Sequence, residues 1–210
     1  MSSTNRGYER HKTDYYFTPI TAIEKFMYEF QYSVLKTNSE IMGKLNWLDP
    51  CCGGDKNNPP AYMSVIKDFY EPKYLCGIDI REDSKADIVT NYLECKEENM
   101  DDHDIIISNP PFTHALEFIN KSLEFVKEGG YVVMLLRLNF FGSKGRKEFF
   151  DTHMPEYCFV HSKRMNFFTD YMIKELKAKG QKVPSGDSIE YAHFVWKKGY
   201  NPEFTKLKVI

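Results

Sequence analysis

The residues best suited to chemistry are Asn109, Pro110, Pro111 and Phe112, which end the apolar stretch DIIISNPPF. An exocyclic amine on an aromatic ring is a poor nucleophile because its lone pair is delocalised. Two acceptors that hold its hydrogens draw the nitrogen towards tetrahedral geometry, and the Asn109 side-chain oxygen and the Pro110 carbonyl suit this task. The prolines stiffen such a loop, and an aromatic ring stacks on a flat base. The pattern predicts a binding site for an amino group on a planar ring, which we call the amine grip. The alternative is a proline-rich turn that only ends a strand.

A second candidate is the stretch LNWLDPCCGGDKNN, in which a strand ends at Asp49 and a turn with Gly53 and Gly54 follows. Glycines at such a place let the backbone pass close to a ligand. The next strand, in YLCGIDI, ends at Asp79. An acidic residue there commonly accepts hydrogen bonds from the ribose hydroxyls of a nucleoside cofactor. Together, the two loops predict an adenosyl-containing ligand at the carboxyl ends of the first two strands.

Alternating strand and helix patterns must position these residues, and they predict one α/β domain with a mostly parallel sheet. Thr18 and Pro19 predict a helix over 20–35, with Thr18 as its N-cap. Further helices are expected after Pro60 and from Leu116 up to Gly129 and Gly130. Residues 169–186, rich in lysine and glycine, are expected to form a substrate-facing loop. The seven predicted strands are 44–48, 74–78, 86–89, 104–108, 131–137, 157–162 and 190–196.

The composition is that of an ordinary folded protein, with 210 residues of which 42% are hydrophobic. No apolar run approaches the roughly 20 residues of a membrane span, so no membrane association is expected. The polar start carries no export signal, and residues 1–13 are expected to be a flexible N-terminus. The five cysteines have no C-x-x-C spacing and the histidines no metal-ligand spacing. A cytoplasmic protein with reduced thiols and no metal is therefore expected.

The net charge of −2 hides an asymmetry between the halves of the chain. Residues 1–120 hold 12 Lys and Arg against 20 Asp and Glu, and residues 121–210 hold 16 against 10. Basic and aromatic residues are interleaved around Arg164, Phe167 and Tyr171. This pattern suits a flipped base and its phosphates, although a solvated helix face would have the same composition. Any nucleic-acid contact is expected on the basic half.

DPCCGG, Asp79, NPPF and the upstream DYYFTP together resemble the class I S-adenosylmethionine-dependent methyltransferases. Within them the sequence is most similar to the amino-methyltransferases that make N6-methyladenine in DNA, with a gamma-like motif order. The stretch EYAHFVWKKGY resembles the last strand of small phage-encoded enzymes of this group. The resemblance spans roughly residues 14–200. It implies a single-domain, Rossmann-like fold over residues 1–210, with a seven-stranded, mostly parallel sheet and helices on both faces. It also implies S-adenosylmethionine as cofactor and DNA as substrate, with the target base flipped.

Carried over position by position, the resemblance implies two sets of site residues. The cofactor set is Phe17, Thr18, Pro19, Asp49, Pro50, Cys51, Gly53, Asp79, Ile80, Asn91 and Asn109. The set for the target base is Asn109, Pro110, Pro111 and Phe112, with Phe167 as a second stacking face. Arg164 is a further expected substrate-binding residue, on the grounds of the basic and aromatic stretch around it and not of the resemblance. One position departs from the family pattern, because Asp55 stands where the glycine loop usually has its last glycine.

Several alternatives remain open from the sequence. The acceptor in this class is adenine N6 in DNA, or else an adenine N6 or guanine N2 amine in RNA. Protein glutamine offers a similar amide, although that family favours Tyr where Phe112 stands. A non-catalytic cofactor-binding subunit is the rival of another class, favoured only by Asp55. Because the chain has no room for a large recognition domain, a separate recognition subunit is a candidate partner. A monomer or weak dimer is expected.

Overall fold

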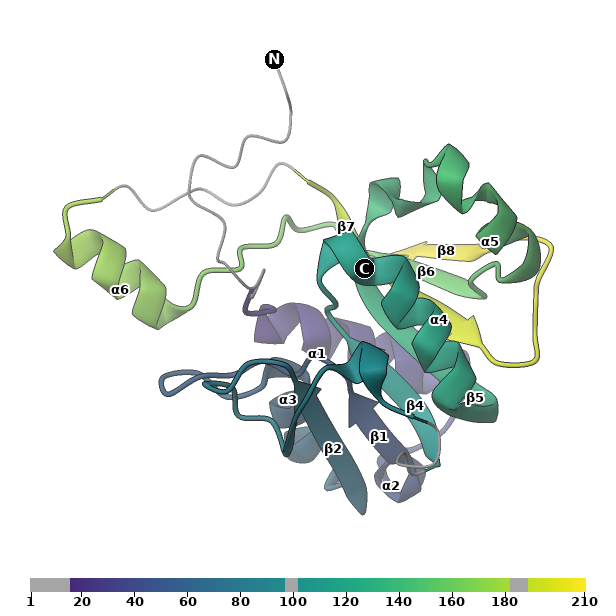
Figure 1. The fold of residues 1–210 in the computed structure, drawn as a ribbon, viewed down its shortest axis with the longest axis horizontal. Helices are drawn as coiled ribbons and strands as arrows, with labels where there is room; N and C mark the ends of the chain where they lie inside the picture. The colour runs from purple at the N-terminus through teal and green to yellow at the C-terminus, as the bar shows by residue number, and fades with distance from the viewer. Residues whose placement is uncertain (1–15, 97–101, 182–188) are drawn as a thin grey trace.

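The computed structural model describes residues 16–96, 102–181 and 189–210, which form an eight-stranded sheet between helices (Figure 1). The strand order is β3-β2-β1-β4-β5-β7-β6-β8. All seven predicted strands are confirmed, and β8 is an additional strand at the sheet edge. The strands are β1 (Asn46–Asp49), β2 (Tyr74–Asp79), β3 (Ile88–Val89), β4 (His103–Ser108), β5 (Val126–Arg137), β6 (Tyr157–Val160), β7 (Tyr191–Lys197) and β8 (Lys206–Val209).

Strand direction decides which loops meet at one edge of the sheet. Strand β7 is antiparallel to both of its neighbours, β5 and β6, and the remaining pairs are parallel. Strands β1, β2, β4 and β6 therefore all end at the same edge. The loops that follow them are brought together there, as in other open α/β sheets.

Helices cover both faces of the sheet, as expected, and the run of isoleucines in β4 shows why. Ile105 and Ile107 pack in the core beneath α1 and α3, whereas Ile106 packs on the opposite face beneath α4. All three are at most 1% exposed. A strand buried on both faces reads as a continuous apolar run. The helices are α1 (Ile20–Glu29), α2 (Ser39–Lys44), α3 (Ala61–Tyr70), α4 (Ala115–Phe125), α5 (Lys147–Thr152) and α6 (Asp170–Ala178).

Shorter helical turns complete the connections. Helix α1 continues directly into a π-helical turn, η1. The 3-10 turn η4 begins at Phe112 and leads into α4. These turns are η1 (Phe30–Leu35), η2 (Tyr92–Glu94), η4 (Phe112–His114), η5 (Leu138–Phe141) and η6 (Lys144–Arg146).

Two predicted helix boundaries are wrong. The N-cap of α1 is Pro19, which has an extended ψ of 124° and caps nothing with its side chain. Thr18 lies outside the helix, buried at 3% exposure, and its hydroxyl is used by another residue. Helix α4 ends at Phe125, before the two glycines, because β5 already begins at Val126, opposite His103 of β4.

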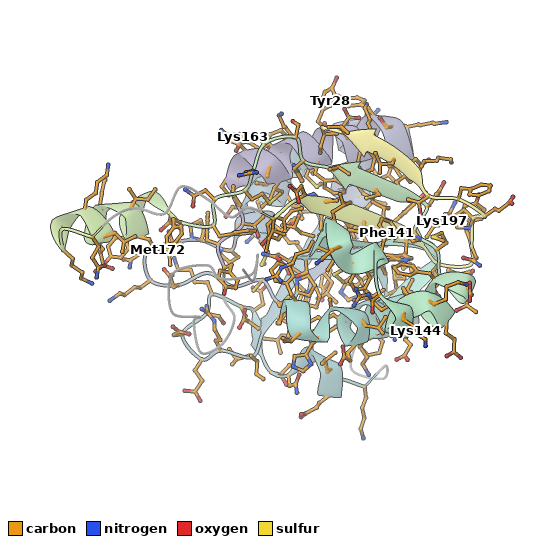
Figure 2. All side chains as sticks on the ribbon, turned by 90° about the horizontal axis from the view of Figure 1, so that it is seen from above. Tyr28, Phe141, Lys144, Lys163, Met172 and Lys197 are labelled. Atoms are coloured by element: carbon orange, nitrogen blue, oxygen red, sulfur yellow. The ribbon has the colours of Figure 1, made fainter. Side chains whose placement is uncertain are left out.

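The segment 169–186 is not a loop throughout, because it contains α6. Thr169 caps this helix by accepting a hydrogen bond from the Met172 N–H at 3.2 Å. In both views α6 lies apart from the sheet (Figures 1 and 2). The end of the predicted loop, and the predicted flexible stretch 1–13, lie outside the described residues. No helix in the described part of the chain is long and apolar enough to cross a membrane.

Candidate active site

A cavity of about 480 Å³ lies where the loops after β1, β2 and β4 meet the segment before α1. Many of the predicted site residues line it: Phe17, Thr18, Pro50, Cys51, Gly53, Asp79, Ile80, Asn91, Asn109 and Pro111. Others are not among its lining residues: Pro19, Asp49, Pro110, Phe112, Arg164 and Phe167. The cavity therefore brings the predicted cofactor loops together with Asn109 and Pro111 of NPPF.

The glycine turn forms one wall of the cavity. Gly53 and Gly54 have φ angles of 69° and 80°, in the left-handed region that favours glycine. A Cβ atom at Gly54 would lie 3.1 Å from Pro60 and Lys85, closer than an ordinary contact. The Gly53 N–H donates to the Asp79 carboxylate at 2.8 Å, so the turn is fastened to the end of β2.

Asp79 is held from both sides and is buried at 6% exposure. Its second oxygen accepts a hydrogen bond from the Arg81 N–H at 2.9 Å, and the Arg81 guanidinium donates to the Gly54 carbonyl. Arg81 also lines the cavity, which the sequence analysis missed. The available signal was a basic residue two positions after the acidic strand end. Carboxylate oxygens have further lone pairs, so Asp79 retains acceptor capacity towards the cavity.

Asn109 presents a free acceptor. Its side-chain Nδ2 donates to Thr18 Oγ1 at 3.1 Å, which fixes the orientation of the amide. The other end of the amide, Oδ1, is buried and has no hydrogen-bond partner among the described residues. A buried acceptor without a partner is costly, and a donor on a ligand would remove that cost. In the next residues, the Pro111 carbonyl accepts from the His114 N–H at 3.0 Å.

The ring of Phe112 faces an aromatic cluster beside the cavity. This cluster consists of Leu135, Met165, Phe167 and Tyr191, with Phe112 and Tyr16 packed against it. The ring centroid of Tyr191 is 5.7 Å from that of Phe112 and 5.0 Å from that of Phe167. The Arg137 guanidinium lies over the Phe112 ring at 4.8 Å, with its Nε buried and unpartnered among the described residues. Sequence reasoning missed Arg137, although it is the charge that ends the run YVVMLL.

Beneath the glycine turn, Asp49 is buried at 1% exposure. Its Oδ1 accepts hydrogen bonds from the Ser108 hydroxyl and from the Cys51 N–H, and its Oδ2 has no partner among the described residues. Burial raises the pKa of Asp49 to about 7. Asp49 therefore supports the cavity floor and does not line it.

Asp55, the departure from the family pattern, is engaged in its own turn. Its carboxylate accepts hydrogen bonds from the backbone of Asn57 and Asn58 and from the Asn58 side chain, at 2.7 to 3.1 Å. These bonds lower the pKa of Asp55, although its partial burial opposes the shift. Asp55 is not among the residues that line the cavity.

Tyr62, at the start of α3, is a further lining residue that the sequence did not indicate. Its hydroxyl is hydrogen-bonded to His193 Nε2 at 2.8 Å, and His193 Nδ1 to His161 Nε2 at 2.8 Å. Burial lowers the pKa of both histidines, that of His161 to about 4. This buried chain runs from the cavity along the face of the sheet that α1 and α3 cover, where His193 stacks on Phe26, and ends at His161, directly after β6. Within the described residues, no group of three or more His, Cys, Asp or Glu side chains is placed to hold a metal ion.

No protein-family model and no curated protein matches this sequence. Solved structures with the same fold include a putative class I S-adenosylmethionine-dependent methyltransferase from Listeria monocytogenes. Its TM-score is 0.59, and the alignment covers 92% of this chain at 14% identity. The type IIG restriction endonuclease BpuSI has a TM-score of 0.62 and 11% identity over 98%. The M protein of the type I restriction enzyme EcoKI has a TM-score of 0.56 and 13% identity over 99%.

This chain spans 65%, 28% and 50% of those three proteins, respectively, so it covers less than two thirds of each. At such identities the likeness concerns the fold. The described residues therefore have the Rossmann-like α/β fold of class I methyltransferases, with one more strand than the seven predicted.

Proposed function

We propose that this protein is a methyltransferase that moves a methyl group from S-adenosylmethionine to the N6 amine of adenine in DNA. The observation that carries the proposal concerns Asn109 at the wall of a ligand-sized cavity: its Oδ1 is buried and has no hydrogen-bond partner in the described part of the chain. The same cavity is walled by a left-handed glycine turn and by the carboxylate of Asp79.

The residues of the cavity fit the proposed cofactor. Its volume of about 480 Å³ lies in the usual range for small-molecule sites. Asp79 offers acceptors for ribose hydroxyls, and Ile80 and Asn91, which line the same cavity, are proposed to contact the adenine ring. The Asn91 side chain is engaged at both ends, since its Oδ1 accepts from the Leu93 N–H and its Nδ2 donates to Glu94. The glycine turn allows the backbone to approach the ligand closely. When bound, the cofactor supplies a methyl group that its sulfonium has already activated.

The chain's own contribution is to orient the amine. Asn109 Oδ1 and the Pro110 carbonyl would accept the two hydrogens of the target nitrogen, while Thr18 holds the Asn109 amide in the required orientation. With its two hydrogens held, the amine directs its lone pair towards the cofactor end of the cavity. Because the acceptors are already in place, no reorganisation is needed at the moment of transfer. The proton released from the methylated amine passes to solvent.

The choice of DNA rests on the family resemblance and on the basic half of the chain. Two proteins with the same fold are restriction enzymes or parts of them, which supports DNA as substrate and a separate recognition subunit as partner. RNA is the alternative acceptor, and product analysis with DNA and RNA in parallel distinguishes the two. The non-catalytic alternative loses its one argument, because the Asp55 carboxylate is engaged in its own turn.

Product analysis tests the proposal. The protein is incubated with methyl-labelled S-adenosylmethionine and, in parallel, with duplex DNA, single-stranded DNA, structured RNA and a protein extract. Each acceptor is then digested and the labelled nucleoside or amino acid identified. Labelled N6-methyladenine from DNA is the expected result. Label in RNA alone or in glutamine alone would move the protein to another substrate class, and no label in any acceptor would contradict methyl transfer by this chain.

A further inference from the structure

A second cavity, of about 370 Å³, lies between the start of α1 and the residues that follow β6. We call it the basic pocket. The residues that line it are Pro19, Thr21, Ala22, Lys25, His161, Lys163, Arg164, Met165, Asn166 and Ile210. Three of them carry a positive charge at neutral pH, namely Lys25, Lys163 and Arg164. His161 contributes little charge there, because burial lowers its pKa to about 4.

Within the part of the chain that the structure describes, no acidic side chain pairs with the charges of the basic pocket. Ile210, the last residue of the sequence, also lines the pocket, and its main-chain oxygen accepts a hydrogen bond from the Ser162 N–H at 2.7 Å. No Asp or Glu lines the pocket, and Lys25, Lys163 and Arg164 form no ion pair with a described residue. By contrast, Lys206 and Lys208, on the nearby strand β8, are paired with Glu156 and Glu29. Cations gathered around a hollow and left unpaired attract an anion.

The start of α1 adds to this positive potential. Thr21 and Ala22, in the first turn of this ten-residue helix, line the pocket. The turn contains no acidic residue, and Pro19 provides no side-chain cap. The first N–H groups of a helix carry partial positive charge and favour anions.

The basic pocket lies next to the proposed amine grip. Pro19, which lines the pocket, follows directly on Thr18, the hydrogen-bond partner of Asn109. Residues 161–164 follow β6, at the same sheet edge as the end of β4. Met165 lines the pocket and also belongs to the aromatic cluster against which Phe112 packs. The aromatic cluster therefore stands between the basic pocket and NPPF.

We infer that the basic pocket binds a phosphodiester group of the nucleic-acid strand that carries the target base. Lysines neutralise a phosphate as point charges, and Arg164 offers a planar fork for two of its oxygens. A base held at NPPF remains attached to its backbone, so an anion site beside the aromatic cluster suits a nucleic acid and not a neutral glutamine. The inference rests on the proposed function and specifies its substrate class.

Binding measured against salt concentration tests this inference. Log affinity falls linearly with log salt concentration, with a slope of roughly 0.9 per phosphate contact on duplex DNA and roughly 0.7 on single strands. Fluorescence anisotropy with duplex DNA, single-stranded DNA and a structured RNA gives this slope for each class of nucleic acid. The double variant Lys163→Gln/Arg164→Gln is expected to lower the slope by about 1 to 2 and to weaken binding about tenfold or more at low salt.

The matched control is Lys144→Gln combined with Lys67→Gln, since neither lysine lines either cavity. Figure 2 shows Lys144 on the side of the molecule opposite Lys163. This control removes the same charge and is expected to leave the slope nearly unchanged. Lys163 and Arg164 are exposed, so both double variants are expected to fold and to bind the cofactor like the unmodified protein. An equal slope for the pocket variant and the control would overturn the inference.

Methyl transfer, measured in the same samples, separates failure of the inference from failure of the proposed function. If the unmodified protein methylates a nucleic acid but the pocket variant keeps its slope and rate, the function stands and the basic pocket is not a phosphate site. If the unmodified protein methylates only protein, both fail. A reduced slope together with reduced methylation of DNA or of RNA supports the inference and identifies the nucleic acid.

Discussion

Thr18 and Asn109 are 91 residues apart in the chain, yet the Asn109 Nδ2 donates a hydrogen bond to Thr18 Oγ1 at 3.1 Å. One residue precedes α1 and the other follows β4, so the bond joins two elements at the edge of the cavity. The other end of the amide, Asn109 Oδ1, has no partner within residues 16–96, 102–181 and 189–210. Thr18 thereby acts as a positioning residue for the proposed amine grip.

Thr18→Val keeps the shape of the side chain but removes this acceptor. An unsatisfied buried amide costs roughly 1–3 kcal/mol, so the amide would turn or shift. We expect the rate of methyl transfer to fall roughly tenfold or more, since 1.4 kcal/mol corresponds to a factor of ten. Single-turnover kinetics at saturating cofactor measure this. Thr18→Ser, which keeps the hydroxyl, is the control and is expected to retain most of the rate; equal rates for Val and Ser would remove Thr18 from the account.

Asp79→Asn tests the proposed ribose contact. Hydrogen bonds to a charged group contribute about 1.5–3 kcal/mol, so the cofactor dissociation constant is expected to rise about tenfold or more. Isothermal titration with S-adenosylmethionine measures it. Asp83→Asn removes a charge that also lies near Arg81 but is 76% exposed, and it is expected to change affinity little. Unchanged affinity in Asp79→Asn would contradict the assignment.

Asp55→Gly restores the residue that the family usually has at this position. Because Asp55 holds its turn through bonds to Asn57 and Asn58, we expect no gain in cofactor affinity and a loss of stability of about 1–2 kcal/mol. Cofactor titration and chemical denaturation measure the two effects. Asp55→Asn, which keeps an acceptor oxygen, is expected to lie closer to the unmodified protein. A tenfold gain in affinity on Asp55→Gly would show that the carboxylate opposes the cofactor after all.

Asp49 predicts a dependence of stability on pH. Burial raises its pKa from 3.8 to about 7, so the folded state holds the proton more tightly than the unfolded state in this window. Its contribution to the free energy of unfolding therefore falls as pH rises from about 4 to about 7, and is constant above that. In Asp49→Asn this group no longer titrates, while an acceptor oxygen remains for Ser108.

The stability of Asp49→Asn relative to the unmodified protein is thus expected to increase by roughly 2–3 kcal/mol between pH 5 and pH 8. Chemical denaturation at both pH values measures this difference, in which the other titrating groups cancel. A difference that does not change with pH would mean that Asp49 ionises in the folded protein as it does in water.

The sequence allowed the fold class and the cavity to be predicted, because both depend on local patterns. The apolar run of β4 and the residues after it are one example, and the acidic ends of β1 and β2 are another. Strand β8 was missed because Leu207 and Val209 are 60% and 61% exposed and alternate with lysines, so no buried run marks it. Helix α6 was only one of two alternatives for its segment, because a lysine-rich stretch fits a substrate-facing loop and a solvated helix face equally well; its apolar side chains Met172, Ile173 and Leu176 are at most half-buried.

Side-chain partners between distant segments could not be predicted. The Thr18 hydroxyl suggested a helix cap, and only the approach of β4 to the start of α1 explains why it binds Asn109 instead. Arg164 was expected to bind the substrate, but the sequence did not show that it lines a separate cavity next to α1. Arg137 drew no attention in the sequence, although it covers a face of Phe112. Each of these contacts depends on strand order, which periodicity does not reveal.

The most direct test of the account is Asn109→Ala, assayed for transfer and for cofactor binding in one preparation. Single-turnover transfer to an adenine-containing duplex is expected to fall by at least about a hundredfold, as when a transition-state hydrogen-bonding group is removed. The cofactor dissociation constant is expected to change less than about threefold, because the free Oδ1 is assigned to the amine. Transfer that persists near the original rate, or cofactor affinity that collapses together with it, would contradict the central claim that Asn109 holds the target amine.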